Sequence, residues 1–304
     1  MRLIRIGTRG SRLALWQANF VAEMLRPVAG AVQVVEIQTT GDRVGDRSLA
    51  EIGGEGLFTK EIQRAALERS VDVAVHSLKD LPTVPVPGLV LAAVPLRGPV
   101  HDVFVSARHE SVDQLPKEAI VATSSPRRRA QLLHHRPDLQ LVPIRGNVET
   151  RLRKLEEGNL DGLILAEAGL ERLGLRHRIN QILDAPWMLP AVGQGALGIE
   201  CREDDSVLRE WLARVDDAPT RWAVTAERSL LRNLGGGCNV PIAALAQCKS
   251  DGLGLRAAVL DADGKKRIYG QFIDKPDQAE ALGEHAAREL TAKGARELLN
   301  ERTS

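Results

Sequence analysis

The sequence predicts an α/β protein that carries a smaller α+β module at its C-terminal end. Strand-like and helix-like patterns alternate through the first two hundred residues, and this alternation is typical of α/β architecture. Beyond residue 202 the pattern changes to one helix, three strands and a final amphipathic helix. A chain of 304 residues is also long enough for two or three domains.

The first lobe is expected to begin with a buried strand over residues 3–8. An amphipathic helix follows over 11–26, because Ser11 is a suitable N-cap and apolar residues recur at helical spacing. These apolar residues are Leu13, Trp16, Phe20 and Met24. The other expected elements of this lobe are strands at 32–39, 71–77 and 88–96 and a helix at 58–70.

The second lobe follows a hinge-like segment at 97–101 and repeats the alternation of strands and helices. Its strands are expected at 102–107, 119–125, 139–146 and 160–170. In the C-terminal module, Pro219 lies near the start of the expected helix. The module's expected elements are helices at 219–234 and 278–299 and strands at 240–247, 253–261 and 266–273.

Composition narrows the class of protein. Hydrophobic residues make up 43% and charged residues 27% of the chain, the profile of an ordinary soluble globular protein. The N-terminal residues contain no apolar stretch of signal-peptide length, and no run approaches the roughly 20 apolar residues of a membrane span. We therefore expect a cytoplasmic protein, in which three scattered cysteines form no disulfide framework. The spacing of the histidines predicts no metal site.

Cations are concentrated in residues 121–154, where eight Arg or Lys residues stand against two acids. Arg127 and Arg128 lie in the first turn of an expected helix, although the helix dipole favours acids at that end. Backbone N–H groups and hydroxyls at a helix start form an anion site, so this pattern favours a bound anion. Arg145 repeats the arrangement at the next strand end, with Arg151 in the following helix. A solvated helix face is the alternative.

The segment VHSLKDLP places Ser77, Lys79 and Asp80 at the end of an expected strand. Ligands of α/β sheets usually bind at such strand ends. Lys79 and Asp80 could form a turn ion pair that contributes only ~0–1 kcal/mol. Alternatively, Asp80 is available to a substrate N–H group or to a developing positive charge. The segment alone leaves both interpretations open.

Other motifs exclude some ligands. The glycine-rich segments lack the spacing of nucleotide-binding loops. Aromatic residues are 3% of the chain and none is interleaved with the basic segment, so no nucleic-acid partner is expected. Cys238 follows three glycines, and such a glycine loop suits a place where the backbone closely approaches a bound group. No histidine is nearby in sequence. A buried structural cysteine is the alternative interpretation.

Eight short segments, in order along nearly the whole chain, resemble porphobilinogen deaminases, also called hydroxymethylbilane synthases. They are GTRGSRLALWQA, GGEGLFTKEI, VHSLKDLP, TSSPRRRAQL, IRGNVETRL, AGLERLGL, LPAVGQGALGIECR and GGGCNVPIAA. The resemblance implies a transferase that deaminates four porphobilinogen molecules and joins them head to tail onto a covalently bound dipyrromethane. Water then releases the linear tetrapyrrole hydroxymethylbilane. Cys238 matches the cysteine that carries the dipyrromethane through a thioether, whereas Cys201 and Cys248 keep the structural interpretation.

The resemblance also implies roles for individual residues. Asp80 matches the catalytic aspartate, which holds pyrrole N–H groups and stabilises positive charge as ammonia leaves. Each porphobilinogen ring bears an acetate and a propionate, and guanidinium groups suit carboxylates. Cofactor or substrate contacts are implied for Arg9, Ser11, Ser77, Lys79, Thr123, Ser125, Arg127, Arg128, Arg145, Gly146, Arg151, Arg172 and Gln194. A mobile loop is implied that contains Asp42, Phe58 and Lys60.

For the fold, the resemblance implies two lobes similar to type II periplasmic binding proteins and a third domain, in a monomer. The implied domains are 1–97 with 196–214, then 98–195, then 215–304. Two residues depart from the family pattern. Glu55 stands where lysine is frequent, and Glu167 stands where small residues are usual, so that an arginine partner would satisfy it.

Two other classes of protein compete with this interpretation. A two-lobed binding protein would bind a small dicarboxylate without catalysis. The absence of an export signal and the third domain with a thiol both count against this alternative. A hydrolase or acyltransferase with a cysteine nucleophile would need a base near Cys238, and none is close in sequence.

Overall fold

The computed structural model describes residues 2–39, 56, 59–184, 187–237 and 240–300. The backbone divides into two compact units, which are described separately. The first unit contains Met1–Gly98 and Gly195–Arg221, and the second contains Pro99–Gln194 and Trp222–Ser304. The three-domain division expected from the resemblance therefore stays a prediction.

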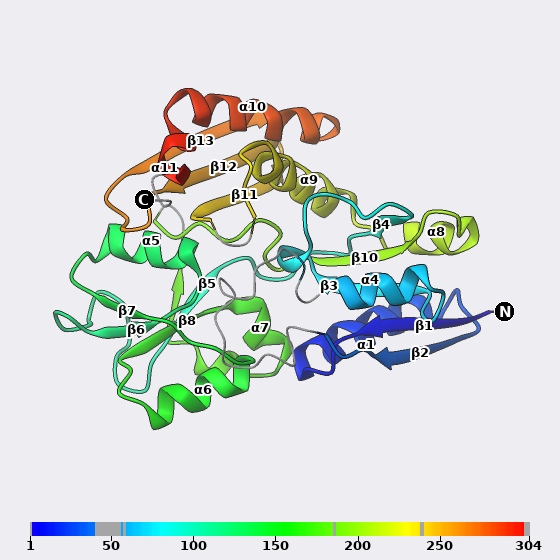
Figure 1. Cartoon of the computed structure of the whole chain (residues 1–304), viewed down its shortest axis with the longest axis horizontal. Helices are drawn as coiled ribbons and strands as arrows, with labels where there is room; N and C mark the ends of the chain where they lie inside the picture. Colours follow the sequence, from blue (N-terminus) through cyan, green and yellow to red (C-terminus); the bar gives the residue numbers. More distant parts are fainter. Residues whose placement is uncertain (1, 40–55, 57–58, 185–186, 238–239, 301–304) are drawn as a thin grey trace. The chain divides into compact units, whose positions relative to one another are not determined.

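The first unit is built on a five-stranded sheet in the order β2-β1-β3-β10-β4. Strands β1, β2 and β3 are parallel, and β10 is antiparallel to both of its neighbours, β3 and β4. Figure 1 shows β10, in yellow-green, beside the cyan β3, although these strands are distant in sequence. The elements are β1 Leu3–Thr8, α1 Arg12–Leu25, β2 Ala31–Glu36, α4 Lys60–Leu67, β3 Val73–Ser77, η1 Leu78–Asp80, β4 Leu89–Ala93, β10 Leu197–Arg202 and α8 Ser206–Ala213.

Helix α1 begins as the sequence predicts, because the Ser11 side chain accepts a hydrogen bond from the Ala14 N–H group at 3.3 Å. Its buried face, however, is not the predicted one. Val21 and Leu25 are fully buried, whereas Trp16 is 36% exposed and stacks on Phe20. Large apolar residues lie on two adjacent stripes of this helix, so that periodicity alone does not identify the stripe that faces the sheet.

The second unit contains another five-stranded sheet, in the order β7-β6-β8-β5-β9. Strand β6 is parallel to β7 and β8, and β5 is antiparallel to β8 and β9. This is the pattern of the first sheet. The elements are β5 Asp102–Val105, β6 Ile120–Ala122, α5 Pro126–His135, β7 Gln140–Val142, α6 Val148–Glu157, β8 Gly162–Ala166, α7 Glu167–Arg172, η2 Arg176–Arg178 and β9 Gln181–Leu183.

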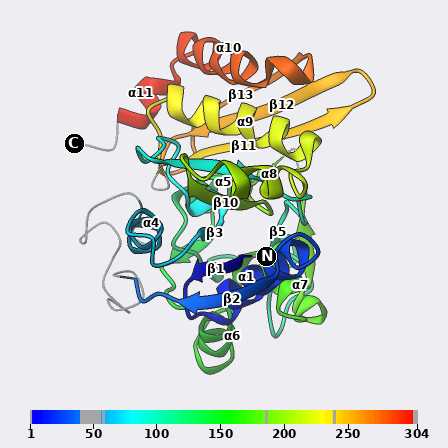
Figure 2. The same ribbon diagram turned by 90° about the vertical axis from the view of Figure 1, so that its right-hand side faces the viewer.

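The same unit includes the C-terminal module, a three-stranded antiparallel sheet in the order β11-β12-β13. Figure 2 shows α9 and α10 alongside this sheet, and both contribute residues to a core with Ala244, Leu255 and Val259. The opposite sheet face packs Leu245 and Leu260 against Ala130 of α5. The elements are α9 Ala218–Asn233, which belongs to this unit from Trp222 onward, β11 Ile242–Lys249, β12 Gly252–Leu260, β13 Arg267–Asp274, η3 Pro276–Gln278, α10 Ala279–Ala292 and α11 Ala295–Asn300.

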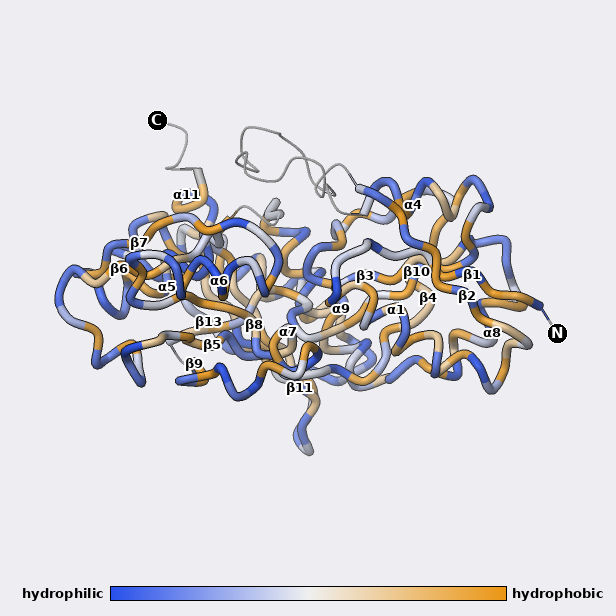
Figure 3. The backbone as a smooth tube through the Cα atoms, turned by 90° about the horizontal axis from the view of Figure 1, so that it is seen from below, coloured by the Kyte–Doolittle hydropathy of each residue, from blue (hydrophilic) through white to orange (hydrophobic). Residues whose placement is uncertain are grey.

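The single terminal helix predicted at 278–299 is wrong in one respect. The chain turns at Gly294, whose φ of +92° lies in the left-handed region, so that α10 ends before it and α11 begins after it. The predicted fold class is confirmed: an α/β chain with two sheet-and-helix lobes and a smaller α+β C-terminal module. Hydrophobic and hydrophilic stretches alternate along the backbone trace, as this architecture requires (Figure 3). Among the described helices, none is both long and apolar enough to cross a bilayer.

In each large sheet the strand directions place the carboxyl ends of the parallel strands on one side, which we call the functional edge. The carboxyl ends of parallel strands meet at the same edge, and an antiparallel strand begins at that edge. In the first sheet, Leu197 at the start of β10 is opposite Ser77 at the end of β3. In the second sheet, Asp102 at the start of β5 is opposite Ala166 at the end of β8.

A buried carboxylate ties together several segments of the first unit. Asp72 is 3% exposed and accepts hydrogen bonds from the Arg5 backbone and Nε, each at 3.0 Å, and from Arg2 at 2.9 Å. Burial opposes ionisation of Asp72, but the hydrogen bonds from Arg5 and Arg2 outweigh burial and hold its pKa below the ordinary value.

We expect Asp72→Asn to destabilise the protein at neutral pH and to matter less in acid. Because the pKa of Asp72 is lower in the folded than in the unfolded protein, its contribution is present above about pH 4 and is lost as the pH falls. Thermal unfolding should show a Tm roughly 5 °C below wild type at pH 7, with a smaller gap at pH 3. An equal gap at both pH values would contradict this role.

Candidate functional site

In the first unit, Ser77, Lys79 and Asp80 lie at the functional edge, immediately after β3 or at its end. Ser77 is fixed by a hydrogen bond that its Oγ accepts from Gln17 Nε2 at 2.8 Å. The short helix η1 is anchored by Leu78, whose side chain is 1% exposed and whose N–H donates to the Ala196 carbonyl at 3.0 Å. An apolar anchor between two polar residues therefore sets the direction of the turn.

Asp80 is half-buried, and its carboxylate takes part in no hydrogen bond or ion pair with any other residue that the structure describes. The alternative of a turn ion pair with Lys79 is thus not found among the described contacts. A half-buried carboxylate without an internal partner is available to donors on a ligand.

Arg9 and Ser11 follow β1, which is parallel to β3, so both reach the same edge of the first sheet. Ser11 is partly committed as the N-cap of α1. Arg9 is half-buried and takes part in interactions of its own. Lys60 is the exposed first residue of α4.

In the second unit, β6 leads into α5 through the predicted hydroxyl-bearing turn. Ser125 is the N-cap, and its Oγ accepts from the Arg128 N–H at 3.4 Å. The Thr123 Oγ1 accepts from the Ser125 N–H at 3.2 Å. Both hydroxyls thus shape the start of the helix, and Pro126 occupies its first turn without losing a hydrogen bond.

Arg127 and Arg128 are 4% and 6% exposed, which excludes a solvated helix face for this pair. Arg127 donates to Asp102 Oδ2 at 2.6 Å and to the Leu189 carbonyl at 2.7 Å. Arg128 donates to Asp102 Oδ1 through Nε at 2.9 Å and to the Ile164 carbonyl at 2.9 Å. The two buried cations therefore share one carboxylate.

Sequence reasoning missed Asp102, which has 0% exposure. Its position follows from the topology, because the antiparallel β5 starts where the parallel strands end. Gln194 completes the group: its Nε2 donates to Asp102 Oδ1 at 3.0 Å and to the Val100 carbonyl at 2.8 Å. No local signal distinguishes this aspartate, since its partners are more than twenty residues away in the chain.

After β7, the residues Arg145, Gly146 and Arg151 lie at the same edge. Gly146 has a φ of +109°, and a Cβ there would come within 2.5 Å of the Thr150 side chain, so only glycine fits. The Arg151 Nε donates to the Gly146 carbonyl at 2.8 Å. The half-buried Arg145 guanidinium has no partner in the described part of the chain.

The short helix α7 follows β8 and carries Arg172. Burial lowers the pKa of Arg172 to about 10, with Glu171 opposing the shift, so the group stays charged at neutral pH. The buried Glu167 begins this helix, and its Oε2 lies 3.3 Å from His101 Nδ1, closer than its 3.8 Å approach to Arg176. A histidine is therefore the nearer partner of Glu167.

Several predicted residues lie outside the described residues, namely Cys238, Asp42, Phe58 and Glu55. The other two cysteines, Cys201 and Cys248, form no disulfide with a described residue. Cys201 is fully buried in β10, and burial raises the pKa of its thiol to about 11. Cys248, near the end of β11, is half-buried. In the described ranges, no three His, Cys, Asp or Glu side chains are grouped to hold a metal ion.

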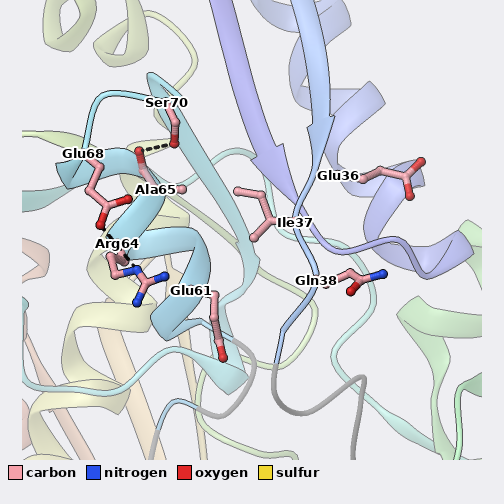
Figure 4. A pocket seen from close by; sticks show the side chains of 8 residues that line it. All are labelled: Glu36, Ile37, Gln38, Glu61, Arg64, Ala65, Glu68 and Ser70. Carbon is pink, nitrogen blue, oxygen red and sulfur yellow. Dashed lines mark hydrogen bonds and ion pairs between the residues drawn. The ribbon is translucent and has the colours of Figure 1, made fainter.

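A pocket of the first unit lies between the end of β2 and helix α4 (Figure 4). Its lining is acidic, with Glu36, Glu61 and Glu68, and Arg64 is paired with Glu68 at 3.5 Å. None of the predicted contact residues lines it. Its charge is unsuited to a carboxylate-bearing ligand.

Fold and site together define a class: an α/β protein with two mixed five-stranded sheets whose strand ends carry arginines, hydroxyls and an available carboxylate. Two family models match the chain. The porphobilinogen deaminase dipyromethane cofactor binding domain matches residues 4–210, and the porphobilinogen deaminase C-terminal domain matches residues 222–292. The chain belongs to the porphobilinogen deaminase family.

Curated relatives extend over the whole chain. The porphobilinogen deaminase of Desulforudis audaxviator is 52% identical over 300 residues, covering 98% of this chain and 97% of the relative. That of Syntrophotalea carbinolica is 49% identical over 298 residues, covering 97% of this chain and 95% of the relative. The family resemblance drawn from the eight segments is thus confirmed.

A solved structure of a nutrient binding protein from Burkholderia cenocepacia bound to methionine is also similar. It is 13% identical, with a TM-score of 0.43, and the match covers 69% of this chain and 90% of that chain. A TM-score this low carries no argument about ligand or activity.

Proposed function

We propose that this chain is a transferase that deaminates four porphobilinogen molecules, joins them head to tail onto a covalently bound dipyrromethane, and releases the linear tetrapyrrole hydroxymethylbilane. Membership of the family supports the reaction. The observation that carries the proposal in the structure is the half-buried Asp80 carboxylate, which no described residue engages. A purely structural carboxylate at this depth would have an internal partner.

The residues present fit a dipyrromethane with several carboxylates. Arg145 offers an uncommitted guanidinium, and the buried Nε of Arg127 has no hydrogen-bond acceptor among the described atoms. Arg151 and Arg172 add charge at the same sheet edge. When bound through Cys238, the dipyrromethane supplies the carbon nucleophile to which porphobilinogen units are added.

Asp80 is proposed to act on the incoming porphobilinogen. Its carboxylate accepts the pyrrole N–H and stabilises the positive charge that spreads over the ring as the aminomethyl group loses ammonia. A new carbon–carbon bond then forms at the methylene carbon. The proton lost from the ring carbon leaves with ammonia as ammonium, so that atoms and charges balance in each round.

The arginine and hydroxyl residues are proposed to hold the acetate and propionate groups. The contact residues are Arg9, Ser11, Ser77, Lys79, Thr123, Ser125, Arg127, Arg128, Arg145, Gly146, Arg151, Arg172 and Gln194. All but Gln194 lie at or after the carboxyl end of a parallel strand or in the helix after it, and Gln194 precedes β10. Cys238, Asp42, Phe58 and Lys60 keep the roles that the family resemblance implies.

We expect Arg145→Gln to raise the KM for porphobilinogen about tenfold, because one charge-assisted hydrogen bond to a carboxylate is lost. Arg145→Lys should recover part of the affinity but not all, since an ammonium group cannot form the bidentate pair. Steady-state kinetics check both variants, and Arg129→Gln, on the exposed side of α5, is the matched control. An unchanged KM in Arg145→Gln would remove this residue from the proposed contacts.

The activity test uses purified protein from a host that makes porphobilinogen. Incubation with porphobilinogen should release one ammonia per substrate consumed and one hydroxymethylbilane per four substrates. A binding protein for a small dicarboxylate, the competing function, would bind porphobilinogen without releasing ammonia. Binding without ammonia release would therefore overturn the proposed function.

We also propose that the protein acts as a monomer in the cytoplasm, without a nucleic-acid or membrane partner. For the absence of a nucleic-acid partner the support is compositional, because net charge is +1 and aromatic residues are few. The monomer and the location rest on the family resemblance. Light scattering at enzyme concentrations used in assays should give the mass of one chain. A dimer mass would contradict the monomer.

A further inference from the structure

The arginine pair of the second unit has an unusual charge balance. Two guanidinium groups, Arg127 and Arg128, share the single carboxylate of Asp102, so the buried group carries 2 − 1 = +1. Asp102 is 0% exposed, and both arginines are nine-tenths buried or more. A buried charge without a partner is costly, so the group has a residual demand for one anion.

Two further observations favour an anion as a binding partner of this group. The Nε of Arg127 is buried and has no hydrogen-bond acceptor among the described residues. Burial lowers the pKa of Arg128, Asp102 opposes that shift, and the neighbouring Arg127 adds to the lowering. The remaining Asp102 contact, from Gln194 Nε2 at 3.0 Å, is neutral and leaves the balance unchanged.

The geometry also shows what Asp102 does to the arginines. Its two oxygens have different partners. An Arg127 nitrogen lies 2.6 Å from Oδ2, and an Arg128 nitrogen lies 2.7 Å from Oδ1. Backbone carbonyls accept further hydrogen bonds from both guanidinium groups: from Arg127 Nη1, which also donates to Asp102, and from Arg128 Nη1. Each side chain is therefore fixed at two points, and Asp102 is the only described acid that touches either of them.

We propose that Asp102 is a positioning residue that limits this arginine site to a single positive charge, so that it holds one carboxylate of the growing chain firmly but reversibly. The inference rests on the proposed function. Each of the four additions occurs at the same Asp80, so the chain must vacate the reacting position after every round. A site with two uncompensated charges would bind a carboxylate more tightly and delay that step.

The test is a series of variants in which only the charge of this group changes. Arg128→Gln gives a net charge of 0, wild type +1, Asp102→Asn +2, and the double variant Asp102→Asn/Arg128→Gln again +1. Asp113→Asn is the matched control, because Asp113 is 66% exposed and pairs at 2.8 Å with His135 of α5, the helix that carries both arginines.

Two quantities are measured on each holoenzyme. The first is the number of porphobilinogen units retained after mixing with one to four equivalents of substrate and quenching, counted by intact-protein mass spectrometry. The second is the division of the kinetic effect between kcat and KM. The mass measurement counts the covalently added units that have not yet been released as product, so it is a readout separate from the steady-state rate.

We expect Asp102→Asn to retain more units, with kcat about tenfold lower and KM unchanged or lower. Arg128→Gln should retain fewer units, with KM about tenfold higher. The double variant should return both quantities to within about threefold of wild type. A merely structural Asp102 would instead give a raised KM and lower retention in Asp102→Asn, with no recovery in the double variant, and that result would overturn the inference.

If Asp102→Asn does not fold because its two buried cations repel each other, the comparison of Arg128→Gln with the double variant still tests the inference. Retention in the double variant no higher than in Arg128→Gln would refute the charge-limiting role. Failure of the proposed function is distinguishable, because wild type would then gain no units at all. If wild type gains porphobilinogen units but retention among the variants does not follow their net charge, only the role of Asp102 is refuted.

Discussion

Asp80→Asn is expected to lower kcat on the order of 10³-fold while leaving the protein as stable as wild type. Asparagine keeps the size of the side chain but cannot offer a negative charge to the cation that forms as ammonia leaves. The carboxylate has no described internal partner, so its loss should cost little stability. Ammonia release measures kcat, and thermal unfolding measures stability.

Asp204→Asn is the matched control for this variant. Asp204 is in the same unit, is 63% exposed and pairs with Arg69 at the surface, so its replacement should leave kcat within about twofold of wild type. A kcat of Asp80→Asn within tenfold of wild type would remove Asp80 from its proposed role. A large loss of stability would show that Asp80 has a structural task instead.

Cys238→Ala is expected to abolish turnover to the limit of detection, because no thioether can form and the chain has no covalent start. The purified variant should have the mass of the bare polypeptide. Cys248→Ala is the matched control, since Cys248 is a half-buried cysteine of the same unit that forms no disulfide with a described residue. That control should carry the bound group and keep its activity.

Residual turnover of Cys238→Ala above a few per cent of wild type would contradict attachment at this cysteine. Attachment at Cys201 instead is disfavoured physically, because that thiol is fully buried and its pKa is raised to about 11. Few thiolates therefore exist there at neutral pH to form a carbon–sulfur bond.

Most strands and helices could be predicted because hydrophobic periodicity is a local signal. The strand at β1 and the cap of α1 by Ser11 followed directly from it. Elements without strong periodicity were missed: β9 has only three residues, and α8 lies in the segment that returns to the first sheet. The break at Gly294 was missed too, because a single glycine does not interrupt an apolar pattern.

From the sequence, only those site residues that follow an expected strand could be located. Polar residues after strands correctly located Asp80 and Arg145 at sheet edges. The pairing of Arg127 and Arg128 with Asp102 depends on an antiparallel register between distant segments, and no local pattern encodes that register. Likewise, the contact of Glu167 with His101 joins residues far apart in sequence.

The most direct test of the central claim, a primer permanently attached to Cys238, is the intact mass of the purified chain. Protein from a host that makes porphobilinogen should exceed the polypeptide mass by two porphobilinogen units less two ammonia molecules, and should gain further single units when substrate is added. A mass equal to the bare polypeptide, unchanged by porphobilinogen, would contradict the account.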